Sequence, residues 1–450
     1  MSAVAGTIDF APAPAGVLQV SDLGVRRIKI LVWAYFWLLI FEGALRKWGI
    51  AELSAPLLII RDPIVLLAYY LGFRHGLFYR NRPLMIITAV AFAFLAASFI
   101  QYVFFDEINP IVALYGLRTN FLHLPLIIVI SMVFTRGDLE KIGFWLLLMA
   151  GPMAALMVLQ FQAAPDDFLN RTASGEGSQI ASAMGKIRPP GTFSFITGAV
   201  QFFTLVSAFA IWLAMEGTRR MKILAAIAGC SVISALGVSG SRLAIVSVGI
   251  VAVAFGVACL ADMRLMRRAY KIVIVAVVLG CGIAMTDFFD EGVQVMTTRV
   301  ENATETEESS GGMSGRVVDT FLEPFRLMEE TPVLGQGLGM GTNVGAMLIS
   351  GRAEFLLSEG EWSRLVLESG AFLGSLYIVL RIGLTFWLGK LSWMRARAGD
   401  ALPLLILGAF APNFINGAFG QPTTLGFSAL GAGLCLAACR MSPTPRALAS

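Results

Sequence analysis

Six arginines stand where they could bind an anion at or near a membrane surface. A guanidinium group binds phosphate oxygens through two parallel hydrogen bonds, so several guanidinium groups that converge on one face suit a phosphate-rich ligand. Each arginine could instead anchor a helix at the membrane interface or pair with a buried carboxylate. The six are Arg61, Arg118, Arg188, Arg242, Arg316 and Arg364.

The longest polar stretch, from Asp287 to Glu361, interrupts an otherwise almost continuous series of apolar segments. It is rich in acidic residues and contains a glycine run at residues 335–341. No strand is expected before this run, and it lacks the lysine of a phosphate-binding loop, which argues against a nucleotide site. The glycines favour a turn in which the backbone approaches a ligand or a helix end closely. We expect chemistry at a membrane surface to involve this stretch.

Composition indicates a membrane protein. Of the 450 residues, 57% are hydrophobic and 14% are charged, and the mean hydropathy is +0.75. Soluble domains contain about 25% charged residues. The net charge of +4 comes from short basic clusters between apolar segments, so it does not indicate nucleic acid. The five cysteines lie in apolar segments and there are only two histidines, which argues against a disulfide framework, a metal site or a cofactor.

Apolar runs of about 20 residues, the length that crosses a bilayer, recur along the chain. We therefore predict an all-α polytopic membrane protein with about 12 transmembrane helices and no internal repeat. The predicted spans cover residues 27–47, 54–73, 83–104, 109–134, 141–161, 190–215, 221–239, 242–261, 269–288, 362–388, 401–417 and 423–440.

The distribution of Lys and Arg predicts the orientation. With the N-terminus in the cytoplasm, most basic residues fall in short cytoplasmic loops, as the positive-inside rule requires. The predicted parts are a flexible cytoplasmic tail (1–26), nine spans (27–286), a large outer loop (287–361), three spans (362–440) and a cytoplasmic tail (441–450). Within the loop, residues 301–312 read as a mobile acidic linker. Residues 316–330 read as an amphipathic helix that lies on the membrane or caps a cavity.

Two of the six arginines lie deep inside predicted spans, at a depth similar to that of two acidic residues. Arg61 and Asp62 in the second span, Arg118 in the fourth and Glu42 in the first are expected at similar depth. Such charges face a water-filled cavity or a partner, because exposure to lipid is costly. Either they pair with one another, or they line an outward-opening cavity with surplus positive charge.

Several motifs on the outer face resemble the O-antigen ligase / O-antigen polymerase superfamily of bacterial membrane glycosyltransferases. The resemblance covers most of residues 27–440 and depends on the order and sidedness of the motifs. They are Tyr115-Gly-Leu-Arg118, Arg188-Pro-Pro-Gly191-Thr-Phe193, Ser239-Gly-Ser-Arg242, Ser314-Gly315-Arg316, Pro332-Val-Leu-Gly335-Gln-Gly337-Leu-Gly339, and Glu368-Ser-Gly370 with Gly374.

This resemblance implies a GT-C-like fold in the bacterial inner membrane, with the large loop in the periplasm. It implies an undecaprenyl-diphosphate-linked glycan donor and transfer to an acceptor hydroxyl, without a metal or a nucleotide sugar. The acceptor would be another lipid-linked glycan in a polymerase of O-antigen, capsule or exopolysaccharide, or lipid A core in a ligase. It further implies that Arg188 and Arg242 hold the diphosphate and that Arg316 contacts it from the loop helix.

The chain departs from the family pattern at one place. Many members carry His-Asn-x-Tyr nine residues before the Glu-x-Gly motif, whereas here Glu359, Gly360 and Trp362 occupy those positions. Either a carboxylate of Glu361, Glu359 or Glu368 removes the acceptor proton, or the acceptor binds elsewhere. Exposed acids in an acidic loop would give the same pattern. The missing histidine favours a polymerase over a ligase.

A function of a different class is also open. Buried Arg and Asp suit a transporter or flippase for an anionic or lipid-linked solute. The lack of repeat symmetry and the long polar loop on one side argue against that alternative. A non-catalytic membrane assembly factor is a third interpretation.

Overall fold

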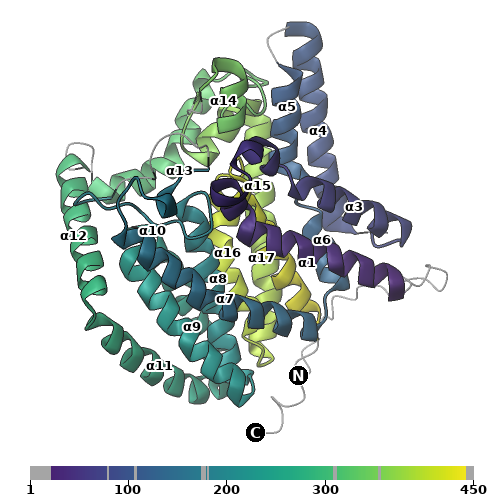
Figure 1. The fold of residues 1–450 in the computed structure, drawn as a ribbon. Helices are drawn as coiled ribbons and strands as arrows, with labels where there is room; N and C mark the ends of the chain where they lie inside the picture. The colour runs from purple at the N-terminus through teal and green to yellow at the C-terminus, as the bar shows by residue number, and fades with distance from the viewer. Residues whose placement is uncertain are drawn as a thin grey trace.

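The computed structural model describes residues 22–78, 81–105, 109–173, 179, 182–307, 312–352 and 356–441, and all the regular elements in this part of the chain are helical (Figure 1). Ten helical segments within the described ranges are long and apolar enough to cross a membrane. The prediction of an all-helical, multi-pass membrane protein is therefore confirmed. The helices are α1 (Asp22–Ala44), η1 (Leu45–Gly49), η2 (Ala51–Leu53), α2 (Ser54–Leu57), α3 (Arg61–Arg74), α4 (Arg82–Phe105), α5 (Pro110–Leu117), η3 (Arg118–Leu122), α6 (Leu126–Val133), α7 (Arg136–Gln162), η4 (Phe168–Asn170), α8 (Ile196–Glu216), α9 (Arg219–Val238), α10 (Arg242–Ala261), α11 (Met263–Ala284), α12 (Asp287–Glu307), α13 (Gly312–Glu330), α14 (Asn343–Ser350), α15 (Glu361–Arg397), α16 (Leu402–Asn416) and α17 (Pro422–Arg440).

Ten of the predicted spans correspond to the ten candidate membrane-crossing segments. The other two, residues 269–288 and 401–417, are also largely helical, in α11 and α16. Neither belongs to the set of ten, and α16 has only 15 residues. The total of twelve spans stays a prediction.

Helices α8 and α17 form the centre of the bundle. In each, 89% of the most apolar window is buried, against 28–72% in the other spanning candidates. Their initial turns lie side by side, because Gln201 Nε2 donates to Thr424 Oγ1 at 3.2 Å. In Figure 1, α11 and α12 form an arc at one side of the bundle, and α13 and α14 lie at the upper end. We call that end the loop end.

The segment assigned to α15 is not one straight helix. Gly370 (φ 78°, ψ 167°) interrupts it, and residues 361–369 turn back along the helix that follows. Glu361 Oε1 lies 2.7 Å from Arg381 Nη1, although these residues are 20 positions apart and a straight helix of that length spans about 30 Å. A Cβ atom at Gly374 would lie 2.8 Å from the Cα atom of Val366. Residues 361–381 therefore form a helical hairpin, the Gly370 hairpin.

The glycine run fills the space beside this break. The backbone N–H groups of Gln336 and Gly337 donate to the carbonyl oxygens of Leu367 and Glu368, at 2.8 and 3.0 Å. These carbonyls are left without helical partners by the break, and an unsatisfied group is costly at membrane depth. A Cβ atom at Gly335 would lie 2.4 Å from the Glu368 carbonyl carbon. The prediction that the glycines allow close approach to a helix end is confirmed.

Most of the predicted outer loop is helical. In the linker predicted at residues 301–312, residues 301–307 continue α12, which packs against α9, and Gly312 begins α13. The remainder of that linker, residues 308–311, lies outside the described residues. The amphipathic helix predicted at 316–330 is confirmed as part of α13. Phe321 makes an edge-to-face contact with Trp362 at 5.0 Å between ring centroids, so α13 covers the hairpin, whereas Phe325 is exposed.

Two glycines with similar positive φ angles test how closely the glycine run packs against the hairpin. Gly335 (φ +77°) faces the hairpin backbone, whereas Gly351 (φ +73°) has open space where a Cβ atom would lie. Gly351→Ala should cost about 1–2 kcal/mol from the left-handed backbone alone. Gly335→Ala should cost about 3 kcal/mol or more, because the hairpin must also move. Thermal unfolding of both variants in detergent measures the difference, and equal losses would contradict the packing argument.

Candidate functional site

The predicted arginines divide into groups with different surroundings. The side chain of Arg316 lies outside the described residues, although its backbone belongs to α13.

Arg61 is buried, and its Nε donates to Glu42 Oε2 at 3.0 Å. Its Nη2 donates to the Pro422 carbonyl at 2.7 Å. A Cβ atom at Gly426 would lie 2.1 Å from its Nη1. Arg61 thus ties α1 and α3 to the start of α17.

Arg118 forms a second ion pair. Its Nη2 lies 3.0 Å from Asp62 Oδ1, its Nε contacts the other carboxylate oxygen, and Nη2 also donates to the Leu58 carbonyl. Asp62 Oδ1 also lies 3.1 Å from His123 Nε2, and His123 Nδ1 lies 2.8 Å from the Tyr35 hydroxyl. The alternative in which Arg61 and Asp62 pair with Glu42 and Arg118 is confirmed.

Arg364 lies inside the Gly370 hairpin between two of the predicted catalytic residues. It contacts Glu361 at 2.9 and 3.0 Å and Glu368 at 2.7 Å. The second oxygen of Glu368 accepts from the Gly341 N–H at 2.9 Å, and Arg381 holds Glu361 from the other side. Both carboxylates are buried and every oxygen has a donor. These contacts join the two arms of the hairpin and fix it to the glycine run.

Glu359, the third predicted catalytic residue, has different surroundings. Its side chain is exposed, just before Gly360, the residue that precedes the hairpin helix. No described residue forms a salt bridge or hydrogen bond with its carboxylate. Three residues after Glu359, Trp362 donates from Nε1 to the Ile415 carbonyl at 3.0 Å. Glu359 is therefore an accessible carboxylate next to a fixed helix start.

Arg188 and Arg242 form the last group. Arg188 lies against the turn between α9 and α10, because a Cβ atom at Gly240 would lie 3.8 Å from its Cγ. Its Nε is buried without a hydrogen-bond partner. Burial and the positive charge of Arg242 lower the pKa of Arg188. In contrast, the nearby Lys186 is paired with Glu291 at 2.8 Å. An arginine that is not neutralised by any described acid, beside a second arginine, is suited to bind an anion.

The loop that carries Arg188 is held by two basic residues that the sequence did not single out. Lys47, in η1, is 2% exposed, and its ammonium group donates to the Gly191 carbonyl. Arg46 donates to Ser194 in the same loop at 3.1 Å. These two cations fix the segment from 188 to 194. Neither role has a signal in the sequence, because the partners are more than 140 residues away.

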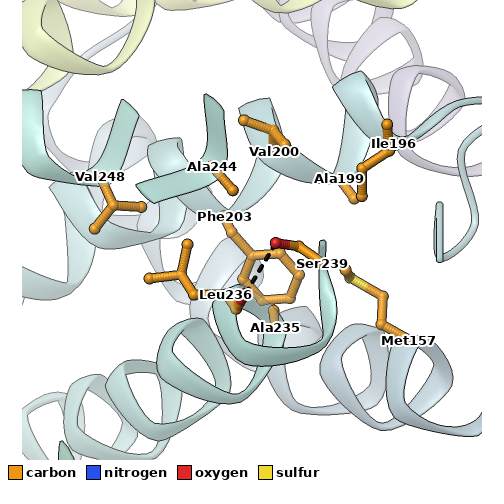
Figure 2. A pocket seen from close by; sticks show the side chains of 10 residues that line it. All are labelled: Met157, Ile196, Ala199, Val200, Phe203, Ala235, Leu236, Ser239, Ala244 and Val248. Carbon is orange, nitrogen blue, oxygen red and sulfur yellow. Dashed lines mark hydrogen bonds between the residues drawn. The ribbon is translucent and has the colours of Figure 1, made fainter. Parts of the chain in front are cut away.

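An apolar pocket lies directly beside the α9–α10 turn (Figure 2). Ser239 and Ala244, which line it, flank Arg242 in the chain. The pocket thus lies beside the turn that carries Arg242. Its lining residues come from α7, α8, α9, α10 and the turn, and are Met157, Ile196, Ala199, Val200, Phe203, Ala235, Leu236, Ser239, Ala244 and Val248.

The described residues contain no group of three or more His, Cys, Asp or Glu side chains that could hold a metal ion. No protein-family model matches the chain, and no curated protein matches it. The functional conclusions below therefore depend on the geometry and chemistry of these residues.

The surroundings of Glu361 and Glu359 predict that neutral substitutions at these two residues change stability by different amounts. Glu361→Gln leaves Arg381 and Arg364 without their shared countercharge in a buried site, and we expect a loss of about 3–5 kcal/mol. Glu359→Gln removes an exposed carboxylate and should unfold like the parent protein. Thermal unfolding in detergent compares them. Parent-like stability of Glu361→Gln would show that the hairpin does not depend on this ion pair.

Proposed function

We propose that the protein is a membrane glycosyltransferase that uses an undecaprenyl-diphosphate-linked glycan as donor. The observation that carries this proposal is Arg188, not neutralised by a described acid, beside Arg242 and next to an apolar pocket in a membrane protein. A diphosphate presents oxygens on two phosphorus atoms, and two guanidinium groups can bind both. The same groups stabilise the negative charge that develops as the lipid diphosphate leaves.

In the proposed reaction, the bond between the sugar's anomeric carbon and the diphosphate oxygen breaks. A bond forms between that carbon and the acceptor oxygen, and the acceptor proton passes to a base. We assign the base to Glu359, because the carboxylates of Glu361 and Glu368 are bound by arginines. Protonating either of those would break a buried ion pair. We assign Arg61, Arg118 and Arg364 to holding the site together, and Arg316 stays a candidate contact to the diphosphate.

The proposed location is the bacterial inner membrane, with the loop end in the periplasm and both termini in the cytoplasm. The acceptor is a second lipid-linked glycan in a polymerase, or lipid A core in a ligase. Deletion of the gene distinguishes these activities through the surface polysaccharides. Loss of long chains with single repeat units retained indicates a polymerase, and accumulated lipid-linked polymer indicates a ligase. Unchanged glycans with altered uptake of a solute would contradict the proposal and favour a transporter.

Substitution of the arginine pair tests the diphosphate contact. Arg188→Ala and Arg242→Ala should each lower glycan transfer at least about 100-fold, the typical effect of losing one group that stabilises a developing negative charge. Arg188→Lys should retain only part of the activity, because an ammonium group cannot bind two oxygens in a planar fork. Transfer from a polyprenyl-diphosphate oligosaccharide by the purified protein in nanodiscs measures these effects.

Lys186→Ala is the matched control, because this cation lies in the same segment but is already paired with Glu291. It should transfer glycan at the parent rate. Normal transfer by Arg188→Ala and Arg242→Ala, in folded protein, would exclude the diphosphate contact.

Substitution of Glu359 tests the base. Glu359→Gln should lower kcat by about 100-fold or more, because proton transfer by a positioned side chain contributes about 10²–10⁴-fold. Its unfolding temperature should stay that of the parent. Glu329→Gln, which neutralises another exposed acid at the end of α13, is the control and should keep full activity. Equal activity of the two variants would remove Glu359 from the mechanism.

A further inference from the structure

Helices α9 and α11 lie side by side and start at the same end of the bundle (Figure 1). The end of α9 meets the residues that follow α11, because a Cβ atom at Gly237 would lie 2.5 Å from the ring of Phe289. The helix α15 begins against α13 at the loop end, and the turn after α15 packs against the start of α11. There, a Cβ atom at Gly399 would lie 3.1 Å from Asp262 Oδ2. Both α9 and α11 therefore start at the end opposite the loop end.

Basic residues stand at the same level on the two helices. A Cβ atom at Gly280 of α11 would lie 3.8 Å from Ile233 Cδ1 of α9, which marks a point where the helices touch. Arg220 precedes Ile233, and Arg267 precedes Gly280, by the same number of residues. The distance is about 20 Å along each helix. These two arginines thus belong to one edge of the bundle.

This edge carries surplus positive charge. The acids that stand nearest in the chain are bound by other arginines, since Glu216 lies 2.8 Å from Arg136 and Asp262 lies 3.0 Å from Arg264. Four exposed cations at the starts of α9 and α11 form no salt bridge with any described acid. They are Arg219, Arg220, Lys222 and Arg267. We call the surface that they form the α9–α11 edge.

Exposed apolar side chains lie among these cations and continue beyond them along both helices. Ile223 and Ile227 of α9 are more than half exposed, as are Met263 and Tyr270 of α11. Cations followed by apolar side chains along a helix fit the boundary between the head groups and the acyl chains of a bilayer. A nucleic acid or a soluble acidic protein would bind the cations but leave the apolar side chains in water.

We propose that the α9–α11 edge binds anionic phospholipids, with their phosphates at the four cations and their acyl chains along the exposed apolar side chains. Each cation near an anionic membrane surface contributes about fivefold to binding. A zwitterionic lipid gains less, because its head group carries a cation of its own beside the phosphate. The edge lies at the other end of α9 from the turn that carries Arg242, so the proposal does not depend on glycan transfer.

Competition between two lipids tests the preference. The full chain in a neutral detergent is mixed with equal amounts of phosphatidylglycerol and phosphatidylcholine that have the same acyl chains, and native mass spectrometry counts the bound lipids. Phosphatidylglycerol should be retained at least about fivefold over phosphatidylcholine. A higher salt concentration should lower this ratio, because salt screens exposed charges. Equal retention of the two lipids would overturn the proposal.

Two double variants localise the preference. Arg220→Gln with Arg267→Gln removes one cation from each helix of the edge and should lower the lipid ratio at least about fivefold. The matched control, Arg26→Gln with Arg27→Gln, removes two exposed cations from α1 and should keep the ratio of the parent protein. Equal losses in the two variants would show that net charge alone attracts the lipid, which would overturn the proposal. Arg219→Gln with Lys222→Gln is a second variant of the edge should the first one unfold.

Photo-crosslinking shows where the lipid lies. The probe is phosphatidylglycerol with a diazirine near its head group, in nanodiscs that contain the full chain. Crosslinks should map to residues 219–227 and 263–270, and inorganic phosphate should not displace them because it lacks acyl chains. Crosslinks confined to other helices would overturn the proposal. Displacement by inorganic phosphate would also overturn it, by showing a site for a soluble anion.

Discussion

A charged side chain inside an apolar helical bundle must have a partner, and this requirement organises the loop end of the protein. Arg61 and Arg118 each bind a carboxylate from another helix, Arg364 binds two carboxylates of its own helical arm, and the buried Arg381 joins Glu361 to the carbonyl groups at the end of α16. Removing one member of such a pair costs more than the pair contributes, because the other charge stays buried. These contacts therefore fix the relative positions of α1, α3, η3, α15, α16 and α17.

Backbone groups inside the bundle also need partners. The break at Gly370 leaves carbonyl groups without helical partners, and the glycine run supplies N–H donors to them. Only residues without a side chain can bring two backbones so close, which explains why glycines recur at residues 335, 337 and 339. A segment that resembles a nucleotide-binding loop in sequence thus acts as a backbone partner for an interrupted helix.

Much of this arrangement could be predicted from the sequence, and the rest had no local signal. Long apolar runs predict helices whatever their neighbours are, and the similar depth of Glu42, Arg61, Asp62 and Arg118 made pairing one of two predicted alternatives. The hairpin could not be predicted, because one glycine in an apolar run is compatible with a continuous membrane helix. Once the chain reverses, Glu361 meets Arg381, a pair that no helical spacing brings together. Residues 301–307 were expected to form a linker because they are acidic and polar. The same composition also occurs at the ends of helices, and these residues are the end of α12.

In the proposed reaction, the hairpin also limits which carboxylate could act as the base. A base must be able to accept a proton without losing a contact on which the fold depends. Glu361 and Glu368 do not meet this condition, because each carboxylate is bound by a guanidinium group. Glu359 meets it: its carboxylate is exposed, while the following helix is fixed by the bond from Trp362 to the Ile415 carbonyl and by the Phe321 ring. A flexible side chain next to a rigid helix start can reach an acceptor and keep its position. Of the three glutamates predicted to be catalytic, the arginines thus leave Glu359 as the one that we propose as the base.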